Sequence, residues 1–256
     1  AANKKIGDSI QYASLIQNAI LPKREMAREL AGRHFVLWRP RDVVGGDFYV
    51  FRASDEGYLV GVVDCAGHGV PGAFMTMVAH TAISVAIDSL GITEPAALLE
   101  QVDARVRAML SADIERSQVA TIMDAGLAYI DLNARSVTFS GAKISLYWCD
   151  GEAVGEIKGA KYAIGSNRSV AFTNKTVPVN AGVTFYLTTD GLLDQAGGTA
   201  GFSFGGRRFE SLVREHAGLP FEQQGEAFAE ALTRYQDGRP QRDDITVLSF
   251  RFAGHQ

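Results

Sequence analysis

Residues 61–72 read GVVDCAGHGVPG, and they complete an apolar run that begins at Tyr58. The run through Val63 is typical of a strand buried on both faces, and the glycines and proline after it predict a tight turn before a helix. Asp64 stands where this strand ends. A carboxylate there either supports the turn or takes part in chemistry.

The composition excludes several classes of protein. The chain has 256 residues, enough for one well-buried core, and its 29 acidic against 25 basic residues argue against a nucleic-acid or anionic-membrane partner. Its two cysteines, Cys65 and Cys149, match no metal-ligand spacing. The most apolar region, residues 58–90, is interrupted by Asp64 and His68, so we expect no membrane span and a soluble chain.

The first residues predict a helix with an apolar stripe. The start, AANKKIGDS, lacks a signal peptide and an initiator Met, which indicates a piece of a longer protein. The stripe consists of Ile6, Ile10, Ala13, Gln17 and Ile20. Such a helix either lies on its own domain or dimerises, and Pro22 favours its end near Leu21. We therefore predict a linker or dimerisation helix within residues 1–30 and a main domain over residues 31–256.

The rest of the chain predicts an α+β fold. Strands are expected at 35–38, 48–52, 58–63, within 119–148, and near 170–177, 183–188 and 245–252. Helices are expected from Pro71 to Leu90, buried on nearly every side, from Pro95 to Leu110 with Met109 on its apolar face, and over about 206–235. The glycine-rich stretch 196–206 reads as a mobile surface loop. Strands in hairpins and helices in separate runs indicate two antiparallel sheets between helical layers.

Three further aspartates share the setting of Asp64. Asp47 follows two glycines in VVGGDFYVF, Asp190 closes an apolar strand in TFYLTTDGLLD, and Asp243 precedes the last strand in RDDITVLSF. Aspartate at a strand end is commonly structural, because it supports turns. If the four converge, however, their mutual repulsion requires protons or cations, and an all-oxygen set favours magnesium or manganese.

The ordered motifs VGGDFYVF, VVDCAGHGVPGA, TTDGLLD and RDDITVLSF resemble the SpoIIE and RsbU branch of the type 2C metal-dependent protein serine/threonine phosphatases. The segment IQNAILP is similar to the linker that enters such domains. The resemblance covers nearly the whole chain. It implies a four-layer α-β-β-α sandwich with two central antiparallel sheets, preceded by an N-terminal helix.

The resemblance also implies the site. Two Mn²⁺ or Mg²⁺ ions would be bridged by Asp64 and ligated by the Cys65 main-chain carbonyl, by Asp190 and by Asp243, with Asp47 acting directly or through water. Water activated by the metals would then hydrolyse a phosphate monoester in one step without a phosphoenzyme. The Cys65 thiol is expected to be a small buried group rather than a nucleophile.

For function, the resemblance implies a phosphatase for phosphoserine or phosphothreonine on a bacterial STAS-type regulatory protein, an anti-sigma-factor antagonist. A dedicated kinase would oppose it in a partner-switching circuit. The domain would be the cytoplasmic part of a longer, membrane-anchored sensor that controls biofilm formation. It would form a homodimer through its N-terminal helix.

Several further residues keep two interpretations each. His68 in the GHG turn either protonates a leaving group or packs in the turn, and Arg39 and Arg41 either hold phosphate or lie in a solvated loop. Lys143, in GAKIS, stands where many relatives of this branch have histidine.

Three other acids are also considered. Asp124 is a minor candidate for metal or hydrogen bonding. Asp194 and Asp244 adjoin expected ligands, and we interpret them as outward-facing acids.

Two alternative functions remain. A partner-binding module of the same fold would have no evident reason to keep four mutually repelling acids. A phosphohydrolase with an aspartyl nucleophile would need a DxD arrangement, but Cys65 and Ala66 follow Asp64. No phosphate-binding GxxxxGK loop occurs, and we do not expect a serine hydrolase elbow.

Overall fold

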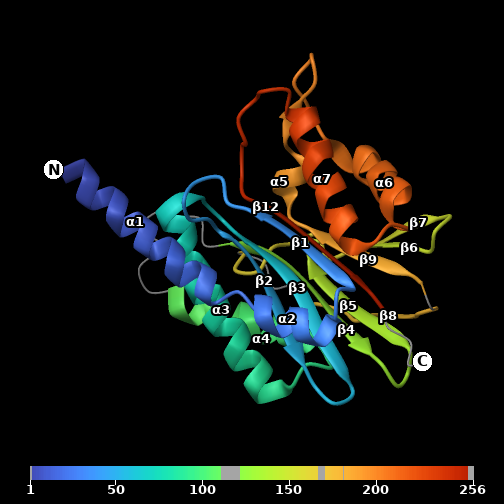
Figure 1. The fold of residues 1–256 in the computed structure, drawn as a ribbon. Coiled ribbons are helices and arrows are strands. Elements are labelled where there is room, and N and C mark those ends of the chain that lie inside the picture. The colour runs from blue at the N-terminus through green and yellow to red at the C-terminus, as the bar shows by residue number, and fades with distance from the viewer. Residues whose placement is uncertain (1, 111–121, 167–170, 181, 253–256) are drawn as a thin grey trace.

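The computed structural model describes residues 2–110, 122–166, 171–180 and 182–252. Two five-stranded sheets form its centre, and Figure 1 shows how they are arranged. The first sheet has the order β2 (Asp47–Ala53), β3 (Gly57–Cys65), β4 (Met123–Asp131), β5 (Ser136–Ala142) and β8 (Lys175–Pro178). The second has the order β1 (His34–Arg39), β12 (Ile245–Arg251), β9 (Thr184–Thr188), β6 (Leu146–Cys149) and β7 (Val154–Ile157). All pairs of neighbouring strands are antiparallel.

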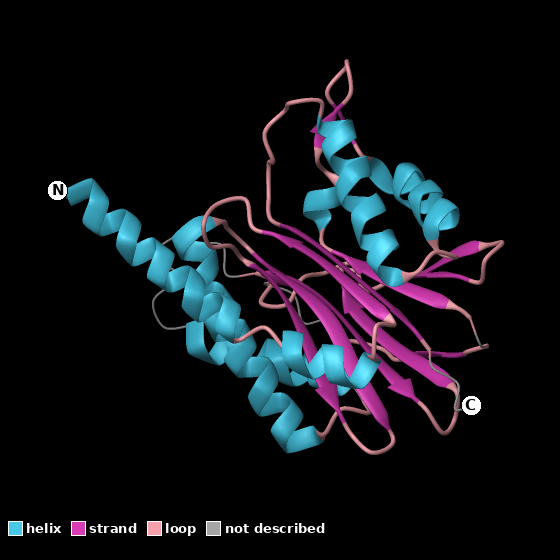
Figure 2. Cartoon of the chain, in the orientation of Figure 1, coloured by secondary structure: helices cyan, strands magenta, loops and turns pink. Residues whose placement is uncertain are grey.

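Helices cover the outer faces of both sheets, as Figure 2 shows. On the side of the first sheet lie α1 (Ala2–Ala19), α2 (Lys23–Leu30), α3 (Gly69–Leu90) and α4 (Pro95–Leu110), and on the other side lie α5 (Asp190–Leu193), α6 (Gly205–His216) and α7 (Phe221–Gln236). This arrangement confirms the predicted α+β sandwich with a preceding helix.

Two hydrophobic clusters hold these layers together. The larger joins the two sheets to each other and the first sheet to α3 and α4, and it also contains Met26 and Leu30 of α2. The smaller fixes α6 and α7 to the second sheet through stacked and edge-on rings, including Tyr186 on Phe228 at 5.8 Å between ring centroids. Helix α2 thus packs with the main domain. The predicted boundary at residue 30 stays a prediction.

Helix α3 differs from its prediction. It begins at Gly69, two residues before Pro71, and only its inner side, which includes Thr76, Ala79 and Ile83, is buried. Phe74 is 70% exposed. By length and composition alone α3 is long and apolar enough to cross a membrane, although no span was expected within residues 58–90. Its inner face packs in the core of the sandwich.

Smaller corrections concern surfaces and connections. Met109 is exposed, not on the buried face of α4. The glycine-rich stretch forms a small sheet of β10 (Ala196–Gly197) and β11 (Phe202–Ser203), and the expected single helix near 206–235 is two helices, α6 and α7. The expected strand near 170–177 is β8, which begins at Lys175, and residues 119–121 and 170 lie outside the described residues.

Candidate metal centre

The four predicted acids gather where the two sheets meet at one end of the sandwich. Asp47 begins β2 and faces Asp64 near the end of β3 in a register pair. Asp190 begins α5 directly after β9, and Asp243 lies two residues before β12. Since β9 and β12 are neighbours, each sheet contributes two acids to the same end.

Asp47 joins the two sheets directly. Its side chain is 2% exposed, and its Oδ2 accepts hydrogen bonds from the hydroxyl groups of Thr189 at 2.7 Å and Thr246 at 2.8 Å. Burial raises the pKa of the Asp47 carboxyl group, while the two hydroxyl donors oppose that rise. The residue that opens β2 is therefore fixed by Thr246 of β12 and by Thr189, which follows β9.

Asp64 lies at the centre of the electrostatic cluster. Burial raises the pKa of its carboxyl group. Neighbouring carboxylates raise that pKa further, those of Asp47, Asp190, Asp124 and Asp243. The groups that perturb Asp64 are thus acids, whose repulsion a bound cation would relieve.

Asp190 and Asp243 are more open to solvent. Burial raises the pKa of Asp190, and nearby carboxylates including Asp243 raise it too, while a hydrogen bond with Asp64 opposes the rise. Asp243 accepts a hydrogen bond at Oδ1 from the backbone N–H of Asp244 at 2.8 Å. These two residues form the solvent-facing side of the cluster.

The cluster fits divalent cations by its chemistry but is not closed around one point. Among the residues that the structure describes, no group of three or more His, Cys, Asp or Glu side chains forms a ready-made metal cage. The donors are nevertheless carboxylate oxygen atoms, which magnesium and manganese prefer as ligands, and a bound cation would relieve their mutual repulsion. Asp47, Asp64, Asp190 and Asp243 would hold such ions once their side chains turn toward a common point.

The backbone around Cys65 is tightly packed. A Cβ on Gly46 would lie 2.5 Å from the Cys65 carbonyl oxygen, and the Cys65 N–H donates to the Gly46 carbonyl at 3.2 Å. Only glycine fits at position 46. The missing side chain lets the Cys65 carbonyl approach the backbone directly before Asp47. The Cys65 side chain is buried, and burial raises the pKa of its thiol, with Asp64 next among the causes, so the thiol is protonated rather than nucleophilic.

Asp244 corrects the prediction of an outward-facing acid. Its side chain is 2% exposed and accepts from the N–H groups of Arg41 at 2.7 Å and Gly46 at 2.6 Å. A Cβ on Gly45 would collide with this carboxylate at 2.5 Å. Asp244 therefore fixes the loop that carries Asp47, whereas Asp194 is exposed as predicted.

Two further side chains hold that loop, and our sequence analysis did not assign this role to either. Gln17 of α1 is 1% exposed; its amide nitrogen donates to the Gly45 carbonyl at 2.6 Å and its amide oxygen accepts from the Gly45 N–H at 3.1 Å. The Thr76 hydroxyl of α3 lies 3.1 Å from the carbonyl oxygens of Gly45 and Gly46. A polar residue within the apolar stripe of α1 was the available signal.

The remaining candidates lie around the cluster. His68 precedes α3 and its Nδ1 lies 2.9 Å from Oδ2 of Asp42, with both side chains nearly half exposed. The Arg41 guanidinium donates to the Arg242 carbonyl at 3.1 Å, so it supports the loop. Lys143 pairs with Asp124 at 2.7 Å.

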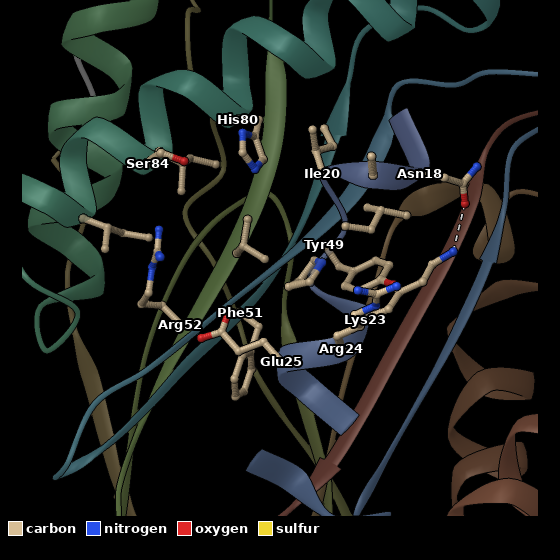
Figure 3. Close-up of a pocket in the computed structure, with 16 residues that line it drawn as sticks. Asn18, Ile20, Lys23, Arg24, Glu25, Tyr49, Phe51, Arg52, His80 and Ser84 are labelled. Carbon is tan, nitrogen blue, oxygen red and sulfur yellow. Dashed lines mark hydrogen bonds between the residues drawn. The ribbon is translucent and has the colours of Figure 1, made fainter. Parts of the chain in front are cut away.

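A large hollow lies away from this cluster. Its volume is about 740 Å³, and it lies between the turn that joins α1 to α2, strand β2 and helix α3 (Figure 3). Arg24, Arg52 and His80 are among its lining residues, and none of the metal candidates lines it. The four motifs therefore place the candidate site at the end of the sandwich where the acids gather, and not in this hollow.

Comparison with known proteins agrees with this fold and site. The family model of stage II sporulation protein E, SpoIIE, matches residues 54–253, so the chain belongs to the SpoIIE family and is a phosphatase domain of the PP2C type. It is similar to the SiaA-PP2C domain of Pseudomonas aeruginosa, with 58% sequence identity over 99% of each chain and a TM-score of 0.93. No curated protein gives a significant match.

More distant structures share the fold. The SpoIIE phosphatase domain with a fragment of its regulatory domain, from Bacillus subtilis, has a TM-score of 0.71 at 18% identity, over 87% of this chain and 63% of that one. RsbX, crystallised in complex with magnesium, has a TM-score of 0.60 at 15% identity, over 86% of this chain and 94% of that one. These likenesses confirm the architecture predicted from the motifs.

Proposed function

We propose that the domain hydrolyses phosphoserine or phosphothreonine on a STAS-type regulatory protein with the help of two Mn²⁺ or Mg²⁺ ions. The observation that carries the proposal is the gathering of two acids from each sheet around Asp64, whose carboxyl group is surrounded by like charge. The magnesium complex of RsbX supports a hard divalent ion in this fold.

The acids and Cys65 would have different roles in this reaction. Asp64, Asp190, Asp243 and the Cys65 carbonyl would hold the ions, and Asp47, fixed by Thr189 and Thr246, would orient them directly or through water. When bound, two divalent ions lower the pKa of water and neutralise charge on phosphoryl oxygens. The protonated, buried Cys65 thiol argues against a phosphocysteine intermediate, and we propose hydrolysis in one step without a phosphoenzyme.

The partners follow from the same family. A dedicated kinase would rephosphorylate the substrate, and the domain would be the cytoplasmic output of a longer membrane-anchored sensor that controls biofilm formation. Likeness to the SiaA-PP2C domain and to the RsbU and RsbW domains of Rv1364c from Mycobacterium tuberculosis supports a partner-switching circuit.

We also propose a homodimer through α1. The face of α1 that carries Tyr12, Leu15 and Ile16 is exposed, and Tyr12 and Leu15 are each 67% exposed. The face with Gln17 instead lies on the domain. Dimerisation would therefore use a different face from the predicted stripe, of which Ile6 alone is strongly exposed, at 59%.

The test is phosphate release from para-nitrophenyl phosphate and from a phosphorylated STAS-type protein, with manganese and with chelator. We expect metal-dependent turnover that Asp64→Asn and Asp190→Asn abolish. Asp88→Asn, at an exposed acid near the end of α3, is the matched control. Wild-type protein that binds manganese and the STAS-type protein but releases no phosphate would instead support a partner-binding module.

A further inference from the structure

Lys143 places a positive charge at the edge of the carboxylate cluster. Its Nζ donates to Oδ2 of Asp124 at 2.7 Å, and Asp124 faces Asp64 in the register of β3 and β4. The hydrogen bond to Asp124 raises the pKa of the Lys143 ammonium group, and the charges of Asp190 and Asp64 raise it further. The ammonium group therefore lies within electrostatic reach of two candidate metal ligands.

The pair is asymmetric in its exposure. The Asp124 side chain is 14% exposed, whereas that of Lys143 is 46% exposed. A lysine ammonium carries three donor hydrogens, and the bond to Asp124 uses one. Asp124 thus binds the ammonium group from the buried side, and N–H donors of Lys143 remain on the side that is open to solvent.

The backbone of Lys143 is also unusual. Its φ of 63° lies in the left-handed region, which residues other than glycine rarely adopt. The N–H of Lys143 donates to the Ala160 carbonyl at 2.7 Å, and residue 143 forms a bridge with Ala125, so the conformation is fixed. Such strained positions are concentrated at functional sites.

The charge count gives the pair a role. If Lys143 neutralises Asp124, the four proposed ligand acids balance two divalent ions. An arriving phosphate dianion would then meet a metal centre without net charge, with the remaining donor hydrogens of Lys143 at its edge. Lysine binds phosphate well as a point charge.

We propose that Lys143 contacts the phosphoryl group of the substrate beside Asp64, and that Asp124 is its positioning residue rather than a metal ligand. This inference rests on the proposed function, because it places the phosphoryl group at the same centre. It also gives a role to the lysine found where many relatives have histidine.

The first test measures binding of inorganic phosphate to manganese-loaded protein by calorimetry, which needs no turnover. A lost charged hydrogen bond predicts that Lys143→Met raises the phosphate Kd about tenfold or more. Lys143→Arg should retain most of the affinity, and Lys175→Met, an exposed lysine on β8, should retain all of it. Manganese affinity measured without phosphate should not fall in Lys143→Met, because the substitution removes a positive charge beside the candidate ligands.

The second test separates the roles of the pair. If Asp124 acts through Lys143, Asp124→Asn weakens phosphate binding but adds nothing in the Lys143→Met background. With para-nitrophenyl phosphate, Lys143→Met should raise KM more than it lowers kcat.

Several results would overturn the inference. Unchanged phosphate affinity in Lys143→Met would do so, as would wild-type protein that takes up manganese but no phosphate. A manganese affinity well below that of the wild type in the double variant Lys143→Met with Asp124→Asn would make Asp124 a metal ligand instead. Wild-type protein that binds manganese and phosphate yet hydrolyses nothing would contradict only the proposed function.

Discussion

Replacing Gln17 with methionine would test whether α1 supports the metal centre. Methionine keeps the length of the side chain but removes both hydrogen bonds to Gly45. The Gly45 carbonyl still accepts from Thr76 at 3.1 Å, whereas the Gly45 N–H loses its bond to Gln17. The perturbation is therefore mainly one buried donor without a partner.

The magnitude follows from that donor. A buried unsatisfied N–H costs about 1–3 kcal/mol, and 2 kcal/mol corresponds to a factor of about 30 in an equilibrium constant. Residues 45 and 46 lead directly to Asp47, and Gly46 also donates to Asp244 at 2.6 Å. If the loop must be ordered before the metal binds, Gln17→Met should raise the manganese concentration for half-maximal activity by up to about 30-fold.

The assay is para-nitrophenyl phosphate hydrolysis across a manganese titration. Gln11→Met, at an exposed glutamine of the same helix, is the matched control. Activity at saturating manganese should recover in Gln17→Met, because the ligands are intact. An unchanged manganese titration and an unchanged Tm, relative to Gln11→Met, would refute the idea that α1 holds this loop.

Four further predictions follow from other residues. Asp64→Asn should abolish turnover yet raise the Tm of metal-free protein by a few degrees, because metal-free wild type must either protonate this carboxyl group or keep its charge among like charges; a lower Tm than the wild type in chelator would contradict this. Asp244→Asn should cost about 2–3 kcal/mol in urea unfolding, since an amide cannot accept from both Arg41 and Gly46; a loss under 0.5 kcal/mol would make the two bonds unimportant. Burial, and next the charge of Arg52, lower the pKa of His80 below 6.5, so below that pH the unfolded chain binds more protons than the folded protein and the folded protein loses stability. The Tm difference between the wild type and His80→Gln, measured from pH 8 to 5.5, should therefore change in this direction, and a constant difference would argue against it. Tyr12→Ser with Leu15→Ser should convert a dimer to a monomer in light scattering while the Gln17 contact is retained, and a monomeric wild-type protein would end the dimer proposal.

The sequence signals for the fold and the four acids were local. Asp64 directly follows an apolar run, and Asp190 begins a helix just after a second apolar run. Each could therefore be predicted as a site residue from its neighbours in the sequence. Alternation and turn residues likewise predicted most strands. The fold class could therefore be predicted from short-range patterns.

What the sequence did not reveal depends on contacts between distant residues. Asp244 was interpreted as outward-facing, because its partner Gly46 lies 198 positions away. The exposed face of α3 is as apolar as its buried face, so periodicity could not separate Phe74 from Ile83. The glycines of residues 196–206 permit tight turns, and only the structure shows that β10 and β11 pair there.

The position of β12 bears on how the protein is made. Among the described strands β12 comes last in chain order, yet it lies inside its sheet between β1 and β9, and Thr246 on it donates to Asp47. Asp243 and Asp244 directly precede it. On the ribosome, β1 must wait for its neighbour until more than two hundred residues have followed it. The proposed metal centre can therefore be assembled only after residues 243–251 have been synthesised, so we expect a chain that stops before them to lack hydrolytic activity.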